Sequence, residues 1–187
     1  MELVQPIRDR KKINDMKIVL KANSLRDHCL FVLGINSGLR VSDLLLLKTT
    51  DVADGKKIKD RISLREQKTG KIKDFPLGAS SVKALKEYLD TRDYTENDWL
   101  FPSQKGGGPI TRQHAWRILS EAAKTVGITE AIGTHTLRKT FGYWAFKSGV
   151  DITRIQKLLN HSSPGITLAY IGITREELDN VYLELNL

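Results

Sequence analysis

The sequence predicts a mainly α-helical domain of the α+β class with one small antiparallel β-sheet. Two observations support this fold class. Over most of the chain, apolar residues recur at the spacing of a helix face, and only residues 54–77 alternate apolar and polar positions between turn residues. The length adds a third observation, because 187 residues are about one domain on a prior of roughly 150 residues per domain. We therefore expect a single domain over residues 1–187.

Three helical segments precede the strands. Residues 6–21 place basic residues between apolar ones, which indicates a surface helix or the remnant of a linker. Ser24 is a suitable N-cap for the next helix, which ends at a break over residues 36–38. Arg40 follows this break, and a short apolar helix then begins at Val41.

Residues 54–77 predict a hairpin or a three-stranded meander. Lys68 lies in its tight turn, where a lysine is ordinarily a solvated charge. The other elements are predicted to be helices, over residues 79–91, 111–126 with Thr111 as the cap, 134–148, 151–160, 164–170 and 174–185.

The charge of the chain favours a polyanionic partner. Lys and Arg number 30 against 22 Asp and Glu, a net charge of +8, and the sequence pI is about 9.6. An excess of this size points to nucleic acid first and to an anionic membrane surface only distantly. No apolar run approaches the roughly 20 residues that span a bilayer, and the N-terminus lacks the apolar region of a secretory signal. We expect a cytoplasmic protein with no membrane partner.

The single cysteine and the histidines do not resemble a metal site. Cys29 lies in the apolar run HCLFVLG, which indicates a buried, inert thiol. No spaced pairs of Cys and His occur, so we expect neither a metal nor another cofactor.

The candidate chemistry lies between Thr134 and Tyr170. His135 and Arg138 are three residues apart on one expected helix, and His161 and Tyr170 follow. Taken singly, each has an ordinary explanation: a structural ion pair for the arginine, and half-buried packing for the tyrosine.

As a set, these residues have a known counterpart. The segments SGLRVSDLLLLKTTDV, QKTGKIKDFPL and THTLRKTFGYWAFKSGVDITRIQKLLNHSSPGITLAYIG resemble the catalytic domain of the tyrosine recombinases, or phage integrases. The likeness covers about residues 25–185. It implies the tyrosine recombinase catalytic-domain fold, with a core over residues 25–170.

The resemblance assigns roles to six residues. Arg40 would be the first catalytic arginine, Lys68 the hairpin lysine, His135 and Arg138 the HxxR pair, His161 the second histidine and Tyr170 the nucleophile. Asp43 matches an acidic position that supports the first arginine. The implied function is site-specific recombination of the integrase or invertase type, through a 3′-phosphotyrosine intermediate, without ATP or a metal.

Further expectations concern the surface and the ends. Arg112, Gln113, Arg117 and Lys139 are candidate DNA contacts, weighed against a merely solvated face. Residues 1–24 are too short for the N-terminal domain of most relatives, so the chain is a natural single-domain enzyme or a catalytic fragment. Residues 171–187 either pack on their own domain or dock on a neighbouring protomer.

The expected partner is double-stranded DNA, in the nucleoid, with a homotetramer on DNA and a monomer possible for the free protein. Two alternatives remain open at this point. A topoisomerase IB-like nicking and resealing enzyme would use the same chemistry without pairing two sites. A DNA-binding regulator would share the scaffold without catalysis. Asn160 and Lys139 depart from the family pattern, at positions that are usually Gly and often His.

Overall fold

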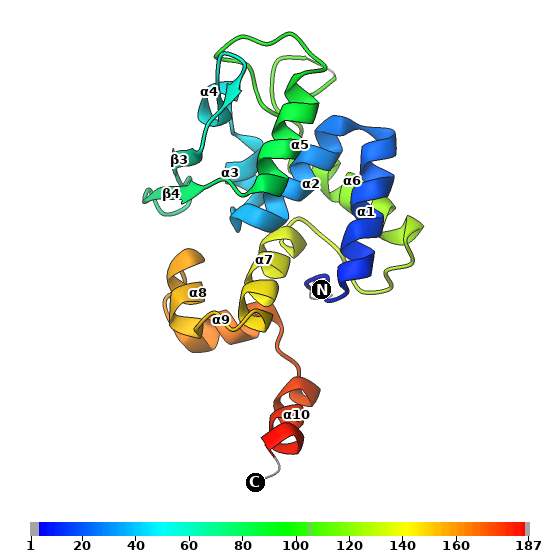
Figure 1. Cartoon of the computed structure of the whole chain (residues 1–187), viewed down its shortest axis with the longest axis vertical. Helices are drawn as coiled ribbons and strands as arrows, with labels where there is room; N and C mark the ends of the chain where they lie inside the picture. The colour runs from blue at the N-terminus through cyan, green and yellow to red at the C-terminus, as the bar shows by residue number, and fades with distance from the viewer. Residues whose placement is uncertain (1–3, 105, 186–187) are drawn as a thin grey trace.

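The computed structural model describes residues 4–104 and 106–185, and it confirms the mainly helical prediction. Helix α2 (Leu25–Ser37) forms the centre of the main core, and residues 28–34 are all buried. A helix that is apolar over most of its circumference must be covered on several sides. Helices α1 (Arg10–Asn23), α5 (Ala79–Leu89) and α7 (Thr136–Lys147) provide that cover (Figure 1).

The two ends of α2 are set by local chemistry. The hydroxyl of Ser24 accepts a hydrogen bond from the backbone N–H of Asp27 at 3.3 Å, as the N-cap prediction requires. Gly38 ends the helix with φ of 60°, a left-handed conformation that suits glycine. A Cβ there would lie 2.6 Å from the ring of Phe141, so α7 packs directly on this turn.

The helix predicted near the N-terminus is present, and one face of it packs on the main core. Helix α1 buries Ile13, Met16 and Leu20 in the main core, and Ile7 is buried before the helix begins. Its basic residues occupy the outer face, which explains why the sequence pattern resembled an isolated surface helix.

The segment after α2 is more divided than the sequence suggests. It forms two short helices, α3 (Val41–Leu45) and α4 (Thr49–Val52). Two separate antiparallel pairs follow, so the predicted hairpin is present but the meander is not. They are β1 (Ala53–Asp54) with β2 (Lys57–Ile58), and β3 (Arg61–Arg65) with β4 (Ile72–Pro76).

The C-terminal third forms a second, smaller apolar cluster against α7. Helix α6 (Arg112–Thr125), capped by Thr111, still belongs to the main core. Helices α8 (Ile152–Leu158) and α9 (Pro164–Ile171) pack instead on the other side of α7, around Tyr143, Ile155, Leu159 and Ile171. Helix α10 (Arg175–Leu185) stands apart at the end of the molecule (Figure 1).

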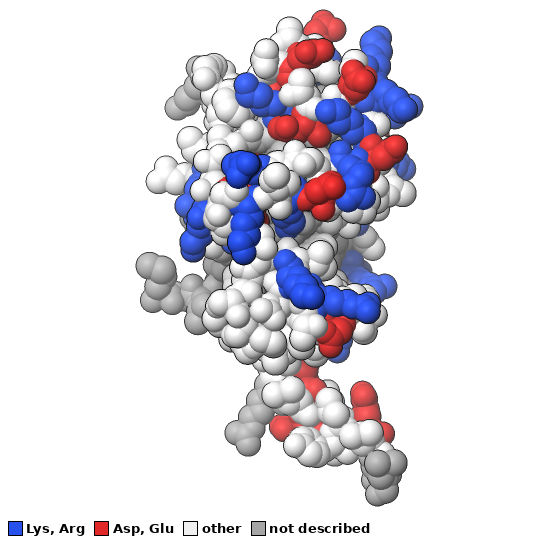
Figure 2. Space-filling view, turned by 90° about the vertical axis from the view of Figure 1, so that its left-hand side faces the viewer, with Lys and Arg blue, Asp and Glu red and all other residues white. Residues whose placement is uncertain are grey.

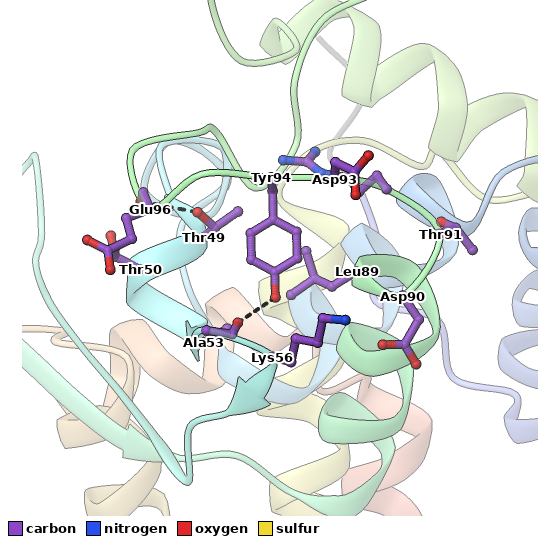
Figure 3. Close-up of a pocket in the computed structure, with 12 residues that line it drawn as sticks. Thr49, Thr50, Ala53, Lys56, Leu89, Asp90, Thr91, Asp93, Tyr94 and Glu96 are labelled. Atoms are coloured by element: carbon purple, nitrogen blue, oxygen red, sulfur yellow. Dashed lines mark hydrogen bonds between the residues drawn. The ribbon is translucent and has the colours of Figure 1, made fainter.

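A cavity of about 490 Å³ opens between α4, the end of α5 and the loop that follows it (Figure 3). Tyr94 stands across it and donates a hydrogen bond to the carbonyl of Gly55 at 2.7 Å. The lining mixes acids with bases and contains none of the predicted site residues. Among the described helices, none has the length and apolarity needed to cross a membrane.

Gly142 is the point of closest approach between α7 and the smaller cluster. A Cβ there would lie 2.6 Å from Cγ2 of Ile171 and 3.1 Å from Cδ1 of Leu159. We predict that Gly142→Val lowers the free energy of unfolding by about 1–3 kcal/mol, because overpacking pushes α9 away from α7. Urea denaturation measures this loss. Gly108→Val is the matched control, since a Cβ at Gly108 meets nothing within 4 Å. An equal loss at both positions would contradict the prediction.

Candidate active site

Arg138 lies where the carboxyl ends of two helices meet. Only 2% of the residue is exposed. Its Nη1 donates to the carbonyl of Gly38, after α2, at 2.6 Å, and its Nη2 donates to the carbonyl of Leu159, after α8. Such terminal carbonyls lack helix partners and carry the negative end of the helix dipole. They hold the guanidinium in place of a carboxylate, and the guanidinium has five N–H donors in all.

Arg40 reaches the same region from the main core. It is the extended residue just before α3, and its Nη1 lies 2.8 Å from Oε1 of Glu66. The Glu66 side chain is 0% exposed and that of Arg40 is 17% exposed. Burial alone favours the neutral acid, but hydrogen bonds from Thr69 and Arg40 and the charge of Arg40 lower the pKa of Glu66. The carboxyl of Glu66 is therefore ionised at neutral pH.

Glu66 is the residue that sequence analysis missed. The support expected from Asp43 for Arg40 comes, among the described residues, from Glu66. Asp43 is buried and accepts a hydrogen bond from the backbone N–H of Gln67 at 2.8 Å. The one available signal was that Glu66 is the only acid between Arg61 and Lys73.

The hairpin that carries Lys68 is fastened on both sides of its turn. Before the turn, Glu66 and Gln67 make the contacts described above. After it, the ammonium of Lys73 donates to the carbonyls of Gly38 and Leu158, each at 3.2 Å. Burial lowers the pKa of Lys73 to about 8, and the charge of Arg138 adds to this effect. Lys68 itself is exposed at the edge of the site.

His135 and Tyr170 face each other across the site. His135 is the N-cap residue of α7, and its Nδ1 lies 3.4 Å from the hydroxyl oxygen of Tyr170. Burial, then the charges of Arg112 and Lys139, lowers the pKa of His135. A neutral imidazole is the form that can accept a proton. The distance is longer than a strong hydrogen bond, as is common before substrate binds.

His161 is presented by a left-handed residue at the end of α8. Asn160 has φ of 49°, a left-handed conformation that asparagine tolerates better than most residues. Nδ1 of His161 lies 3.1 Å from the hydroxyl of Thr167, and its ring meets that of Tyr170 edge-to-face at 4.8 Å. These contacts place the imidazole against the phenol.

The phenol of Tyr170 is protonated at neutral pH. Burial raises the pKa of Tyr170, and the charges of Arg138 and Arg40 oppose that rise. Lys139 adds a cation 5.2 Å from the ring centroid. Lys139 is only 5% exposed, so a direct DNA contact fits its position poorly. Lys139 contacts the ring of Tyr170, the candidate nucleophile, instead.

The structure thus brings Arg40, His135, Arg138, His161 and Tyr170 together, with Lys68 at the edge. The candidate DNA contacts Arg112, Gln113 and Arg117 are exposed on α6, and Arg112 is close enough to influence His135. Lys and Arg also gather over the middle of the face that carries the hairpin (Figure 2). Within residues 4–104 and 106–185, no three His, Cys, Asp or Glu side chains are grouped to hold a metal ion.

Comparison with known proteins shows the family of the chain. A family model described as "Phage integrase family" matches residues 9–177. The chain is 45% identical over 182 residues to the protein named Probable integrase/recombinase YoeC of Bacillus subtilis strain 168, with 97% of both chains covered. It is 32% identical to tyrosine recombinase XerD of Listeria innocua, covering 87% of this chain and 55% of XerD.

Solved structures show the same fold. The XerA recombinase superposes with a TM-score of 0.80 at 26% identity, covering 100% of this chain and 66% of XerA. A lambda integrase dimer bound to a COC′ core site has a TM-score of 0.68 at 20% identity, covering 91% and 60% of the two chains. The chain thus spans nearly all of YoeC but about half of XerD and two thirds of XerA.

The imidazole of His161 is predicted to stay neutral down to acidic pH. Burial, then the charges of Arg138 and Arg40, lowers the pKa of His161 to about 4. An unfolded histidine titrates near 6.5, so the unfolded chain binds this proton first, and the unfolding free energy falls as the pH drops from about 6.5 toward 4. NMR titration of the histidine ring protons, assigned with His161→Gln, measures the pKa. A midpoint at or above 6.5 would contradict the prediction.

Proposed function

The chain belongs to the phage integrase family, and from that premise we propose that it is a site-specific DNA recombinase. In this proposal it forms a single catalytic domain that cleaves and rejoins strands through a 3′-phosphotyrosine on Tyr170. The observation that carries the proposal is the position of the phenol, 3.4 Å from Nδ1 of His135 and within the fields of Arg138 and Arg40. A buried tyrosine needs no such surroundings for packing alone.

The two arginines would hold the scissile phosphate. Attack on a phosphodiester places extra negative charge on two non-bridging oxygens, and a guanidinium can donate two parallel hydrogen bonds to such oxygens. Arg138 is suited to this because its structural partners are neutral carbonyls. Removing one such donor costs on the order of 3–4 kcal/mol in the barrier.

Two proton transfers would accompany the exchange of bonds. His135 accepts the phenolic proton as the oxygen of Tyr170 bonds to phosphorus. The bond from phosphorus to the 5′ oxygen breaks, and Lys68 donates a proton to that oxygen. His161 donates a hydrogen bond to a non-bridging oxygen. Attack by another 5′ hydroxyl reverses these steps and joins a new strand.

DNA would lie across the face formed by α6 and the hairpin. Arg112, Gln113 and Arg117 are exposed on α6, next to the active site. The XerH recombinase has been solved bound to its difH substrate in a pre-cleavage complex and to a palindromic difH substrate in a post-cleavage complex. A DNA substrate would place this chain on the nucleoid in the cytoplasm.

Helix α10 would join protomers into a tetramer on DNA. Its side chains Leu178, Val181, Tyr182 and Leu185 follow helical spacing, and each is at least 50% exposed. Its first turn is held in place by Glu177, which accepts a hydrogen bond from the Tyr143 hydroxyl at 3.0 Å. An anchored helix with an uncovered apolar stripe suits docking on a second copy.

Tyr170→Phe is predicted to abolish the covalent protein–DNA complex while DNA binding is retained, because only the attacking oxygen is lost. The assay uses a nicked duplex whose cleaved fragment diffuses away, so that the covalent product accumulates and is seen by denaturing electrophoresis. Tyr94→Phe, in the separate cavity, is the matched control and should react like the wild type.

The same assay separates the competing functions. A wild type that binds the duplex but never becomes linked to it would favour a DNA-binding regulator. Covalent product without exchange between two labelled sites would favour a topoisomerase-like enzyme. Exchange between the sites supports the recombinase.

Replacing Leu178 and Leu185 with Ser is predicted to prevent tetramer formation on paired sites while single-site DNA binding is retained. Each buried leucine contributes roughly 2 kcal/mol to docking, so their loss weakens each protomer contact strongly. Analytical ultracentrifugation of the protein with two-site DNA measures the assembly. Asn180→Ser, also on α10, is the control. Unchanged assembly by the double variant would exclude a role for this stripe.

A further inference from the structure

The carboxylate of Glu66 joins three parts of the candidate active site. Its Oε1 faces Arg40 at 2.8 Å. Its Oε2 accepts hydrogen bonds from the hydroxyl of Thr69 at 2.7 Å and from the side-chain amide of Asn160 at 2.9 Å. Thr69 follows Lys68 in the hairpin turn, and Asn160 precedes His161. The buried carboxylate of Glu66 therefore contacts Arg40 directly. It also contacts the residues next to Lys68 and His161 in the chain.

The backbone around Glu66 closes the turn that holds Lys68. The N–H of Glu66 donates to the carbonyl of Lys71, and the N–H of Gly70 donates to the carbonyl of Glu66, both at 2.9 Å. Arg65 also donates to the carbonyl of Gly70 at 2.6 Å. The turn is thus a closed unit whose position depends on where the Glu66 side chain is held.

We propose that Glu66 is a positioning residue, which orients the guanidinium of Arg40 through Oε1 and the turn of Lys68 through Oε2. This inference rests on the proposed function, because it assigns Glu66 to the same reaction. A buried carboxylate needs a partner for its charge, and here the ion pair at Oε1 and the hydrogen bonds at Oε2 tie the arginine and the hairpin to one group. Glu66 touches no reacting atom.

The two effects can be separated with DNA that has sulfur in place of the 5′ bridging oxygen at the cleavage site. Thiols are far more acidic than alcohols, so a thiolate leaves without a proton. Cleavage of this substrate does not depend on a proton from Lys68, but it still depends on Arg40. The experiment compares single-turnover formation of the covalent complex on oxygen and sulfur substrates.

Glu66→Gln should slow cleavage of the oxygen substrate by roughly 100-fold, the usual scale for a misplaced catalytic group. The sulfur substrate should recover only part of this loss, since Arg40 remains displaced. Thr69→Val removes the hydrogen bond to Glu66 and the one that the Thr69 hydroxyl accepts from the backbone N–H of Lys71, both at the turn. It leaves Arg40 in contact with Glu66, so its defect should be smaller and should disappear with sulfur. Glu87→Gln, which breaks a surface ion pair with Lys21, is the matched control.

The proposal is overturned if Glu66→Gln, with wild-type DNA affinity and melting temperature, cleaves within twofold of the wild type. It is also overturned if sulfur does not relieve the Thr69→Val defect. Thr69→Val leaves the ion pair intact, so it decides the matter even if Glu66→Gln folds poorly. A wild type that forms no covalent complex on either substrate would instead defeat the proposed function itself.

Discussion

The convergence of two helix carboxyl ends is the constraint on which the rest of the site depends. The terminal carbonyls of α2 and α8 attract positive charge, and two cationic side chains bind there. Arg138 donates to the carbonyls of Gly38 and Leu159, and Lys73 donates to those of Gly38 and Leu158. Backbone dipoles stabilise these charges without cancelling them, unlike a carboxylate. The same hydrogen bonds fasten α7, the hairpin and α8 to the end of α2. The contacts that stabilise the buried charges therefore also hold these elements together.

The site lies on the seam between two apolar clusters of unequal size. Arg40 and the hairpin belong to the main core, whereas Tyr170 and His161 depend on the smaller cluster around Ile155, Leu159 and Ile171. Local stability follows the amount of buried apolar contact, so the proposed nucleophile occupies the less stable side. Pro164 and Gly165 do not break the chain before Tyr170. They form the first turn of α9, and Ser163 is the N-cap of that helix.

The sequence predicted the local features well because those depend on neighbours in the chain. Helical periodicity, the caps at Ser24 and Thr111 and the β3–β4 hairpin are all present. The ion pair between Arg40 and Glu66 was missed because it joins residues 26 positions apart, and only folding decides which acid meets the arginine. The partner of α1 could not be predicted for a similar reason: an amphipathic pattern marks the buried face but not the element that covers it. The six site residues came from the family resemblance, and their convergence is what the structure adds.

The balance of charge explains why a basic site needs internal acids. Arg40, Arg138 and Lys73 are close enough for each arginine to lower the pKa of its basic neighbours. Glu66 opposes this repulsion at Arg40, because its carboxylate oxygen Oε1 lies 2.8 Å from the guanidinium. With Glu66, the arginines stay in place while the cluster keeps a net positive charge, and the neutral histidines add nothing to the repulsion. In the proposed reaction, a phosphate between the arginines would relieve the remaining repulsion, so the substrate would supply the last stabilising charge.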